Sequence, residues 1–310
     1  MIQSLAAPEF NLRYTLESGQ TFRWRRTNDG YLGIIGGSVV AVRQTGDQLF
    51  YDTSHPEVLD EAWLRRYFAL DVDLPAILDD IDRDAQIHEA IQRYRGLRIM
   101  RQEPWECLAS YILSSFNNIK RIEGMIERLA QRFGAPVSLQ GYAAHTFPTA
   151  QAIAEAPLDV LAALGLGFRA AYLRDAARQV LEQRSDLSSL KHLPYDEAKA
   201  TLLTVPGVGD KVADCVLLFG HDQLEAFPID VWIERVLRFH FRRALPPRSR
   251  QHAFARRHFG RCAGYAQQYL FHHYRNKQHH HALSVVQWSR PSVPVPPRPE
   301  VAAALQNIAS

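Results

Sequence analysis

One lysine in this sequence stands where it could do chemistry. Lys211 follows two glycines in residues 203–220, LTVPGVGDKVADCVLLFG, and it opens an otherwise apolar helix. Phosphate binding by a P-loop, covalent attack by the amine, or a solvated helix start would each explain it. A P-loop needs the pattern GxxxxGK[ST] entered from a strand. Here Val212 follows Lys211, Gly207 and Gly209 are too close together, and the preceding YDEAKATLLT reads as helix, so the P-loop is excluded.

What remains is a helix, the tip VPGVG, and a second helix. Pro206 disfavours helix at Val205, and glycines allow backbone conformations that other residues resist. Because Gly207 and Gly209 have no side chains, the amides of the tip and of the following helix N-terminus could approach a phosphate closely. A tight connection between packed helices would use the same residues, and this alternative stays open.

Lys211 shares one face of its helix with Asp214 and Cys215, which follow three and four residues later. Lys211 could simply pair with Asp214 at the surface. Asp230, in AFPID, begins the amphipathic segment VWIERVLRF, where helix capping alone would explain it. An ionised carboxylate is also stabilised at a helix N-terminus. An amine beside such a carboxylate in a partly desolvated cleft would form a nucleophile with an assisting acid or base.

The distribution of charge adds to this picture. The formal net charge is only +3, yet residues 236–275 contain no Asp or Glu. Their arginines alternate with Phe, Tyr and His: Arg238, Arg242, Arg243, Arg248, Arg250, Arg256, Arg257, Arg261 and Arg275. Such a segment suits a polyanionic partner such as nucleic acid, and a solvated basic face is an equally good explanation.

Composition limits the class of protein. With 310 residues, 46% of them apolar, the chain is expected to be globular and to form roughly two domains. No apolar run approaches the ~18 residues of a membrane span, and MIQSLAAPEF lacks a signal-peptide layout, so an intracellular protein is expected. Cys107, Cys215 and Cys262 are far apart and form no CxxC, which argues against a disulfide framework and against a zinc or iron–sulfur site.

Periodicity indicates the elements that must position these residues. TFRWRR, YLGII, SVVAVRQ and QLFYD alternate apolar and polar residues between turn signals, which predicts an antiparallel meander. From His55 onward the period becomes helical. We expect helices over residues 105–116, 119–133, 158–164, 169–183, 195–204, 210–220, 230–241, 248–258 and 263–274.

The predicted fold class is therefore α+β, with an N-terminal antiparallel sheet lobe packed on a mainly helical body. We expect domains at residues 1–97 and 98–278, followed by a Pro-rich tail of uncertain order at 279–310. The tail begins with His279, His280 and His281, which could bind a metal, although a solvated tail explains them better.

Several blocks together resemble a known family. LLTVPGVGDKVADCVLLFG followed by EAFPIDVWIERV is similar to the helix–hairpin–helix and Gly/Pro…Asp signature of a DNA glycosylase superfamily. SGQTFRW, LRIMRQEPWECLASYILSSFNNIKRIEGMIERLAQRFG, LGLGFRAAYL and GYAQQYLF resemble, in the same order, the 8-oxoguanine DNA glycosylase family. The resemblance extends from about Leu12 to Tyr274.

The resemblance implies a bifunctional glycosylase and AP lyase acting on double-stranded DNA that contains 8-oxoguanine. The damaged nucleotide would be flipped out of the duplex. Lys211 would attack the sugar C1′, and Asp230 would stabilise the positive charge that develops on the sugar. Partial burial beside other positive charge would help Lys211 to act as a free amine. No metal or organic cofactor is implied, a cation at the hairpin carbonyls would be structural, and the enzyme would be a monomer.

The resemblance also implies a base pocket. Gly19 matches the position whose backbone carbonyl accepts the N7 hydrogen that 8-oxoguanine has and guanine lacks. Cys215 and Phe271 match the residues that enclose the base, and Gln267 matches the residue that contacts its Watson–Crick edge. Without the family, Phe271 would be read as core and Gln267 as a surface polar residue.

A DNA interface follows in the same way. Phe168 matches an aromatic wedge, and Arg121 and Arg169 match arginines that read the orphaned cytosine. Phe116 stands where the animal enzymes have an asparagine, and Trp232 stands where a histidine is frequent, so preference for cytosine opposite the lesion is in doubt. The implied DNA-binding residues are Phe116, Asn117, Arg121, Phe168, Arg169, Gly207, Gly209, Val231 and Trp232.

Two other functions remain open from the sequence: a glycosylase for another damaged base, and a non-catalytic helix–hairpin–helix DNA-binding protein. A pure binding module needs neither Lys211 nor Asp230. The expected location is the nucleoid-containing cytoplasm if the chain is prokaryotic, and the nucleus if it is eukaryotic.

Overall fold

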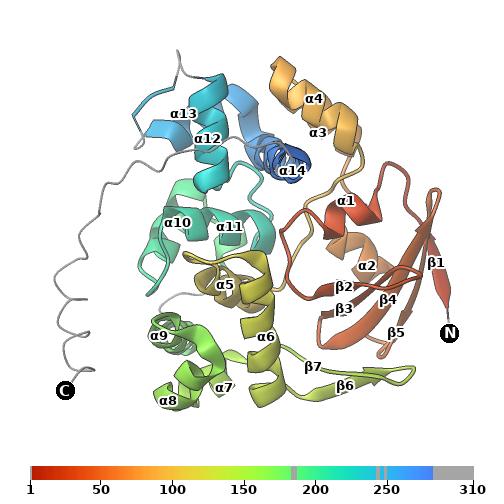
Figure 1. The fold of residues 1–310 in the computed structure, drawn as a ribbon, viewed down its shortest axis with the longest axis vertical. Helices are drawn as coiled ribbons and strands as arrows, with labels where there is room; N and C mark the ends of the chain where they lie inside the picture. The colour runs from red at the N-terminus through yellow and green to blue at the C-terminus, as the bar shows by residue number, and fades with distance from the viewer. Residues whose placement is uncertain (1, 183–186, 242–244, 248–249, 282–310) are drawn as a thin grey trace. The chain divides into compact units, whose positions relative to one another are not determined.

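A computed structural model describes residues 2–182, 187–241, 245–247 and 250–281. Residues Met1–Asn276 form one compact unit, and a second unit begins at Lys277. The first unit contains an antiparallel sheet followed by helices (Figure 1), which confirms the predicted α+β fold class. The domain boundary between residues 97 and 98 stays a prediction.

Five antiparallel strands form the N-terminal sheet in the order β1-β5-β4-β3-β2. They are β1 (Gln3–Ala6), β2 (Trp24–Arg26), β3 (Tyr31–Ile35), β4 (Ser38–Thr45) and β5 (Gln48–Thr53). Gly36 and Gly37 connect β3 to β4 with φ angles of 53° and 77°, and two successive positive φ angles are typical of the hairpin turn that matches strand twist. The meander is confirmed for β2 to β5. β1 was not predicted, because four residues without a turn signal beside them carry little pattern.

Four short helices belong to the N-terminal part of the chain: α1 (Leu12–Leu16), α2 (Glu61–Tyr67), α3 (Leu74–Ile81) and α4 (Ala85–Tyr94). Each begins after an Asn or Asp whose side chain accepts a hydrogen bond from a backbone amide of the first turn. The loop between α1 and β2 contains Gly19 and Gln20, which reach into the helical body.

The helical body follows. Its main helices are α5 (Pro104–Leu113), α6 (Ile119–Phe133), α7 (Ala150–Glu155), α8 (Leu158–Leu161), α9 (Arg169–Leu181), α10 (Tyr195–Leu203), α11 (Asp210–Gly220), α12 (Val231–His240), α13 (Gln251–Phe259) and α14 (Ala263–His281). The bounds of α6 and α11 are those predicted. α14 is seven residues longer than predicted, because the segment after Tyr274 continues the helix.

Other local features depart from the predictions. The helix expected over residues 105–116 ends at Leu113. The helix expected over residues 158–164 ends at Leu161 and continues as a π-helical turn (Ala162–Leu166), in which Gly165 has a φ of 80°. A hairpin of β6 (Pro136–Leu139) and β7 (Tyr142–His145) lies between α6 and α7 and was not predicted. Its Val137 and Ala144 pack against Ile34 and Val39 of the large sheet, so the hairpin joins the sheet to the helices.

Apolar side chains form two principal cores, one under the sheet and one among the helices. α11 is buried almost along its whole length, from Val212 to Phe219. No helix in the described part of the chain is both long enough and apolar enough to span a membrane. The structure of residues 282–310 and the side chains of His279, His280 and His281 lie outside the described residues.

Candidate active site and DNA interface

Lys211 lies in the first turn of α11, where its side chain is half-buried. Its Nζ donates a hydrogen bond to Ser114 Oγ, 3.0 Å away at the end of α5, and lies 5.0 Å from the centroid of the Tyr111 ring. Ser114 Oγ in turn donates to the Tyr111 carbonyl at 2.7 Å. The neighbours that hold the amine are thus a hydroxyl and an aromatic face. The positive charge expected beside Lys211 is not found among these contacts of the amine in the described residues.

Asp214 does not pair with Lys211. It is fully buried, its Oδ1 accepts a hydrogen bond from Tyr195 at 2.5 Å, and its Oδ2 accepts one from Lys199 Nζ at 3.0 Å. His252 Nδ1 lies 3.0 Å from the same Oδ2. Asp214 therefore ties α11 to α10 and α13 and leaves the Lys211 amine available, so the surface-pair explanation of Lys211 is wrong.

Asp230 caps α12, as the sequence suggested. Its Oδ1 accepts hydrogen bonds from the amides of Trp232 at 3.0 Å and Ile233 at 2.8 Å. Burial raises the pKa of this carboxyl, while the cap hydrogen bonds and the nearby charge of Lys211 act in the opposite direction. The structure thus brings Asp230 within electrostatic reach of Lys211.

Cys215 lies one helical turn after Lys211 and is buried. Burial raises the pKa of its thiol to about 12, although the positive charge of Lys211 opposes the shift. The side chain is therefore a neutral thiol at physiological pH. It can form an apolar wall of a pocket, but it is not prepared to act as a nucleophile.

Gly19 and Phe271 are brought together from opposite ends of the chain. Gly19 has a φ of 83°, and a Cβ at this position would lie 3.3 Å from Phe271 Cε1 and 3.3 Å from Ile119 Cδ1. Gly19 also lines a cavity of about 230 Å³. Gln267, one turn before Phe271 on α14, is 4% exposed, and its Oε1 is buried without a hydrogen-bond partner among the described residues. An unsatisfied buried acceptor of this kind fits a ligand contact.

Phe116 is displayed by the loop between α5 and α6. It is 97% exposed, the largest fraction for any large hydrophobic side chain in the described residues, and its φ is 50°. Phe168, which precedes α9, is 56% exposed. Exposed aromatic side chains at loop tips are suited to stacking on bases or to insertion between them.

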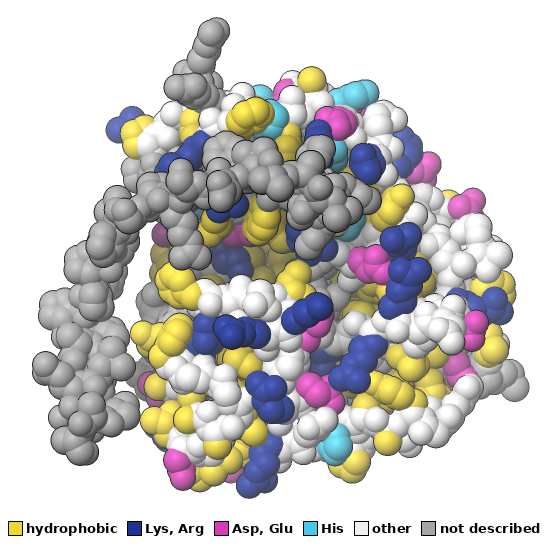
Figure 2. Space-filling model, in the orientation of Figure 1, with side chains coloured by type: hydrophobic (Ala, Val, Ile, Leu, Met, Phe, Trp, Pro, Cys, Tyr) yellow, Lys and Arg dark blue, Asp and Glu magenta, His cyan; other side chains and the backbone are white. Residues whose placement is uncertain are grey.

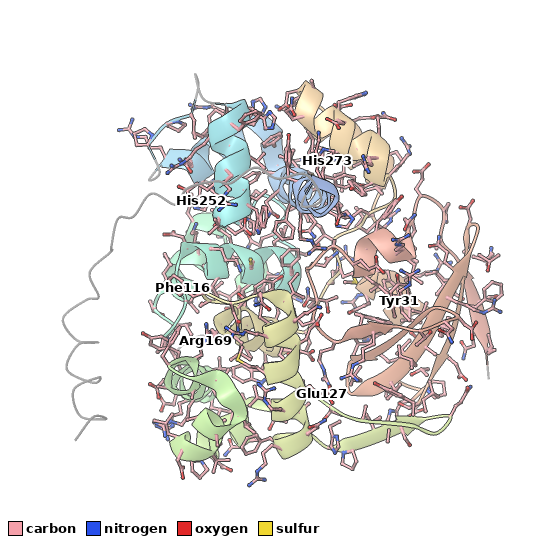
Figure 3. The ribbon with its side chains drawn as sticks, in the orientation of Figure 1. Tyr31, Phe116, Glu127, Arg169, His252 and His273 are labelled. Carbon is pink, nitrogen blue, oxygen red and sulfur yellow. The ribbon has the colours of Figure 1, made fainter. Side chains whose placement is uncertain are left out.

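Arg169 contacts both of these aromatic residues. Figure 3 labels Arg169 and Phe116. Its Nε donates to the Ser115 carbonyl at 2.9 Å, its Nη2 donates to the Phe116 carbonyl at 3.2 Å, and its guanidinium lies 4.4 Å from the centroid of the Phe168 ring. Burial lowers the pKa of Arg169, and the charge of the exposed Arg121 adds to this effect. The donors of Arg169 are thus used within the protein, and its contact with a cytosine stays a prediction.

Asn117 is also used within the protein. Its Nδ2 donates to the Leu113 carbonyl at 3.2 Å, and its Oδ1 accepts from the Asn118 amide at 3.0 Å, so the side chain closes the end of α5. Its predicted contact with DNA stays untested.

The hairpin between α10 and α11 is present, and one of its two glycines is packed while the other faces open space. Gly207 has a φ of 81°, and a Cβ there would lie 2.7 Å from Tyr172 Cβ. Gly209 is the N-cap of α11, contributes no side-chain hydrogen bond, and has open space around its Cβ position. At the start of α12, Val231 is 63% exposed, and Trp232 stacks with Arg235 at 5.4 Å.

The arginine-rich segment 236–275 is partly neutralised in the fold. Arg238 pairs with Glu234 at 2.7 Å, and Arg256 pairs with Asp196 at 3.3 Å and with Glu225 at 3.5 Å. Arg242, Arg243 and Arg248 lie outside the described residues. On the face shown in Figure 2, Lys and Arg side chains also gather over the region of α5 and α6. The acid-free segment is therefore less of a continuous basic surface than its sequence indicates.

Three residues next to the site were not singled out from the sequence, namely Gln20, Tyr111 and Ser114, and Arg275 was noted only as part of the arginine-rich segment. Gln20 is fully buried, and its carbonyl accepts hydrogen bonds from Tyr111 Oη at 3.1 Å and Gln102 Nε2 at 2.6 Å. The ring of Tyr111 then lies under Lys211. Nothing in local periodicity marks such contacts, because they join residues about ninety positions apart.

Among the described residues, no group of three His, Cys, Asp or Glu side chains is arranged to hold a metal ion. The chemistry available at the site is that of an amine, a carboxylate and a pocket with an unpaired amide oxygen.

Comparison with known proteins identifies the family of this chain. Residues 4–108 match the family model for the N-terminal domain of 8-oxoguanine DNA glycosylase, and residues 109–254 match the HhH-GPD superfamily of base excision DNA repair proteins. A probable N-glycosylase/DNA lyase from Methanothermobacter thermautotrophicus is 32% identical over 86% of this chain and 94% of its own length. The N-glycosylase/DNA lyase of Saccharomyces cerevisiae is 32% identical over 74% of this chain and 67% of its own.

A solved structure has the same fold. The 8-oxoguanine glycosylase/lyase of Clostridium acetobutylicum, in complex with double-stranded DNA containing cytosine opposite 8-oxoG, is 30% identical with a TM-score of 0.83, over 90% of this chain and 98% of its own. Both domain models thus match this chain, in the same order as the sequence blocks. The protein belongs to the 8-oxoguanine DNA glycosylase family of N-glycosylase/DNA lyases.

Proposed function

We propose that this protein excises 8-oxoguanine from double-stranded DNA and then cleaves the strand at the resulting abasic site. The observation that supports this most is the half-buried amine of Lys211, which is held by Ser114 and Tyr111 within electrostatic reach of Asp230. An amine beside a desolvated carboxylate is the pair that covalent excision requires.

In this mechanism the damaged nucleotide leaves the duplex and enters the pocket beside Gly19, Gln267 and Phe271. The deprotonated Nζ of Lys211 attacks C1′ and forms a C–N bond, while the bond between C1′ and N9 breaks and the base leaves with that electron pair and takes up a proton. Asp230 stabilises the positive charge on the sugar and assists the proton transfers. Opening of the sugar gives an iminium ion, and loss of a C2′ proton then expels the 3′ phosphate.

The substrate preference rests on the pocket. A carbonyl of Gly19 that accepts the N7 hydrogen of 8-oxoguanine would be left unpaired by guanine, which disfavours the normal base. A glycosylase for another damaged base is the alternative, and the same pocket residues distinguish the two. Such an enzyme would work in the compartment that holds the chromosome, as a monomer bound to the duplex.

Borohydride trapping tests the covalent step. Duplex DNA with one 8-oxoguanine is incubated with the protein and reduced, and the covalent adduct is measured on a denaturing gel. Wild type should give an adduct, Lys211→Gln should give none, and Lys191→Gln, in an exposed turn, should trap like wild type. Equal trapping by Lys211→Gln, or no adduct with wild type, would overturn the mechanism.

The base opposite the lesion provides a second test. Phe116 can fill a gap or stack, but it cannot donate or accept the hydrogen bonds that identify cytosine. We expect the wild type to prefer cytosine about tenfold less strongly than Phe116→Asn in single-turnover excision, since the missing discrimination is about that of one hydrogen bond. Phe116→Asn should widen the ratio in favour of cytosine. Strong cytosine preference in wild type, unchanged by Phe116→Asn, would contradict this.

A further inference from the structure

Arg275 lies at the base pocket but has no part in the chemistry described above. It follows Phe271 by one turn of α14, and its guanidinium carbon is 5.4 Å from the centroid of the Phe271 ring. Its Nη2 donates a hydrogen bond to the Glu17 carbonyl, at the start of the turn that contains Gly19. Arg275 also lines the cavity of about 230 Å³ that Gly19 borders.

The close contact between Arg275 and Gly19 depends on the glycine. A Cβ at residue 19 would overlap Nη1 of Arg275. The φ of 83° favours glycine at this position, and an added Cβ would also require the end of the Arg275 side chain to shift. Because Gly19 has no side chain, the Arg275 guanidinium can lie beside the Gly19 backbone, which is expected to recognise the lesion.

One nitrogen of this guanidinium is left over. Nη1 is buried and has no hydrogen-bond partner among the described residues, and burial lowers the pKa of Arg275. A buried charged donor without an acceptor is costly, and such groups commonly mark a place where a ligand completes the site. On the same helix the acceptor Gln267 Oε1, two turns earlier, is also buried without a partner among the described residues, as is Nδ1 of His272. Gln267 and Arg275 thus offer one acceptor and one donor, as recognition of a base with both kinds of group requires.

We propose that Arg275 is a further recognition residue for the damaged base, with Nη1 donating a hydrogen bond to a carbonyl oxygen beside N7 of 8-oxoguanine. This inference rests on the proposed function. In 8-oxoguanine the N7 hydrogen is flanked by the carbonyl oxygens at C6 and C8. A donor next to the Gly19 backbone therefore faces an acceptor on whichever side of N7 it lies. A guanidinium is permanently charged, so it also stabilises the negative charge that the departing base acquires.

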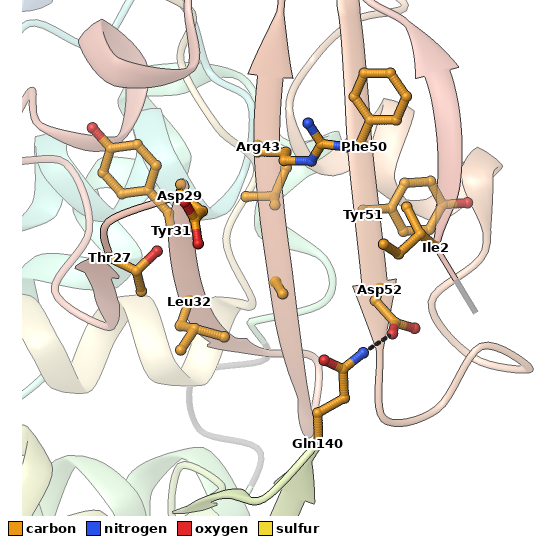
Figure 4. A pocket seen from close by; sticks show the side chains of 13 residues that line it. Ile2, Thr27, Asp29, Tyr31, Leu32, Arg43, Phe50, Tyr51, Asp52 and Gln140 are labelled. Atoms are coloured by element: carbon orange, nitrogen blue, oxygen red, sulfur yellow. Dashed lines mark hydrogen bonds between the residues drawn. The ribbon is translucent and has the colours of Figure 1, made fainter.

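The test separates base recognition from the rest of the reaction. Arg275→Met keeps an unbranched apolar side chain against Phe271 but removes the donor and the charge. The matched control is Arg43→Met, because Arg43 also stacks on an aromatic ring, at 4.5 Å from Phe50, in a cavity on the sheet (Figure 4). Both variants remove one positive charge, so a general loss of attraction to DNA would affect them equally.

Two single-turnover rates are measured for each protein: excision of 8-oxoguanine from a duplex, and β-elimination on a duplex with a preformed abasic site. Arg275→Met should slow excision at least tenfold while changing elimination less than threefold, because the abasic substrate has no base to recognise. Arg43→Met should change neither rate by more than twofold. Arg275→Lys, which keeps the charge but not the fork of donors, should fall between wild type and Arg275→Met.

Two results would overturn the proposal. Equal losses in excision and elimination would show that Arg275 only supports the fold around Lys211, and wild-type excision by Arg275→Met would show that its free donor is not used. Failure of the wild-type protein to excise 8-oxoguanine while still cleaving abasic sites would instead reject the proposed function itself.

Discussion

Asp230 combines a structural and a chemical task at the level of a single residue. Its carboxylate caps α12 through two amide hydrogen bonds, and it also faces the charge of Lys211 from a half-buried position. The cap could be read from the sequence, because Asp before an amphipathic segment is a frequent helix start. Its desolvation could not, since burial depends on elements distant in the chain.

Replacing Asp230 with Asn should separate these two tasks. The amide oxygen keeps the cap. Because burial raises the pKa of Asp230 above its ordinary value of 3.8, the folded state favours the protonated carboxyl, so the ionised form costs stability at neutral pH. That cost disappears as the pH falls below the ordinary value. We therefore expect Asp230→Asn to be at least as stable as wild type at pH 7 and to have no stability advantage near pH 3. Its rate of excision should fall about 100-fold.

Urea unfolding at both pH values and single-turnover excision measure these effects. Asp60→Asn is the matched control, since Asp60 caps the exposed start of α2 through a hydrogen bond of 2.8 Å to the Trp63 amide. Asp60→Asn should change neither the free energy of unfolding nor the rate of excision. A clear loss of stability in Asp230→Asn at pH 7 would mean that the carboxylate is needed to hold the fold.

The helices and the short hairpin show which elements an apolar sequence pattern can predict. α6 and α11 have the predicted bounds, because each has a marked apolar face and a terminal residue that stops or starts a helix. The hairpin β6–β7 and the turn at Gly165 were missed. Two four-residue strands carry too few alternations to be recognised, and Gly165 breaks the helix through a backbone conformation that the apolar period does not reveal.

The two glycines of the hairpin between α10 and α11 should respond differently to alanine. Gly207→Ala forces a Cβ against Tyr172 at a φ of 81°, and should cost roughly 1–3 kcal/mol of stability. Gly209 has open space and an ordinary φ of −108°, so Gly209→Ala should cost about 1 kcal/mol or less, as expected for a poorer N-cap.

The methyl group added in Gly209→Ala points into the space where a phosphate would approach. The affinity of this variant for duplex DNA should therefore fall severalfold. Urea unfolding and fluorescence anisotropy on a labelled duplex separate the two effects. Unchanged affinity in Gly209→Ala would argue that the tip only connects two helices.

At the scale of the whole molecule, Gln20 joins the sheet lobe to the helical body. Its side chain is fully buried, donates to the carbonyls of Arg98 at 2.9 Å and Thr15 at 3.1 Å, and accepts from the Met100 amide at 2.8 Å. This one side chain fixes the turn beside Gly19 against the connection that leads into α5. The sequence predicted both lobes, but the residue that holds them in register is visible only once they are folded together.

Gln20→Leu should lower the free energy of unfolding by about 2–4 kcal/mol, because it removes the hydrogen bonds that Gln20 makes to the Arg98 carbonyl and the Met100 amide in the interior. Excision of 8-oxoguanine should fall more than cleavage of a preformed abasic site, since Gly19 moves and Lys211 stays on its own helix. Gln131→Leu, which removes a surface bond of 2.9 Å to Glu127, should change stability by less than about 0.5 kcal/mol. Equal effects of the two variants would refute this role.

Phe116 lowers the stability of the fold while it presents an aromatic ring that we expect to contact DNA. Its φ of 50° places a bulky residue in a region that costs roughly 1–2 kcal/mol and that asparagine or glycine adopts far more readily. Its ring recovers nothing from the interior, because it is 97% exposed. A library of variants of this protein that is selected only for thermal stability should therefore soon replace Phe116. A library selected for repair of DNA should keep it.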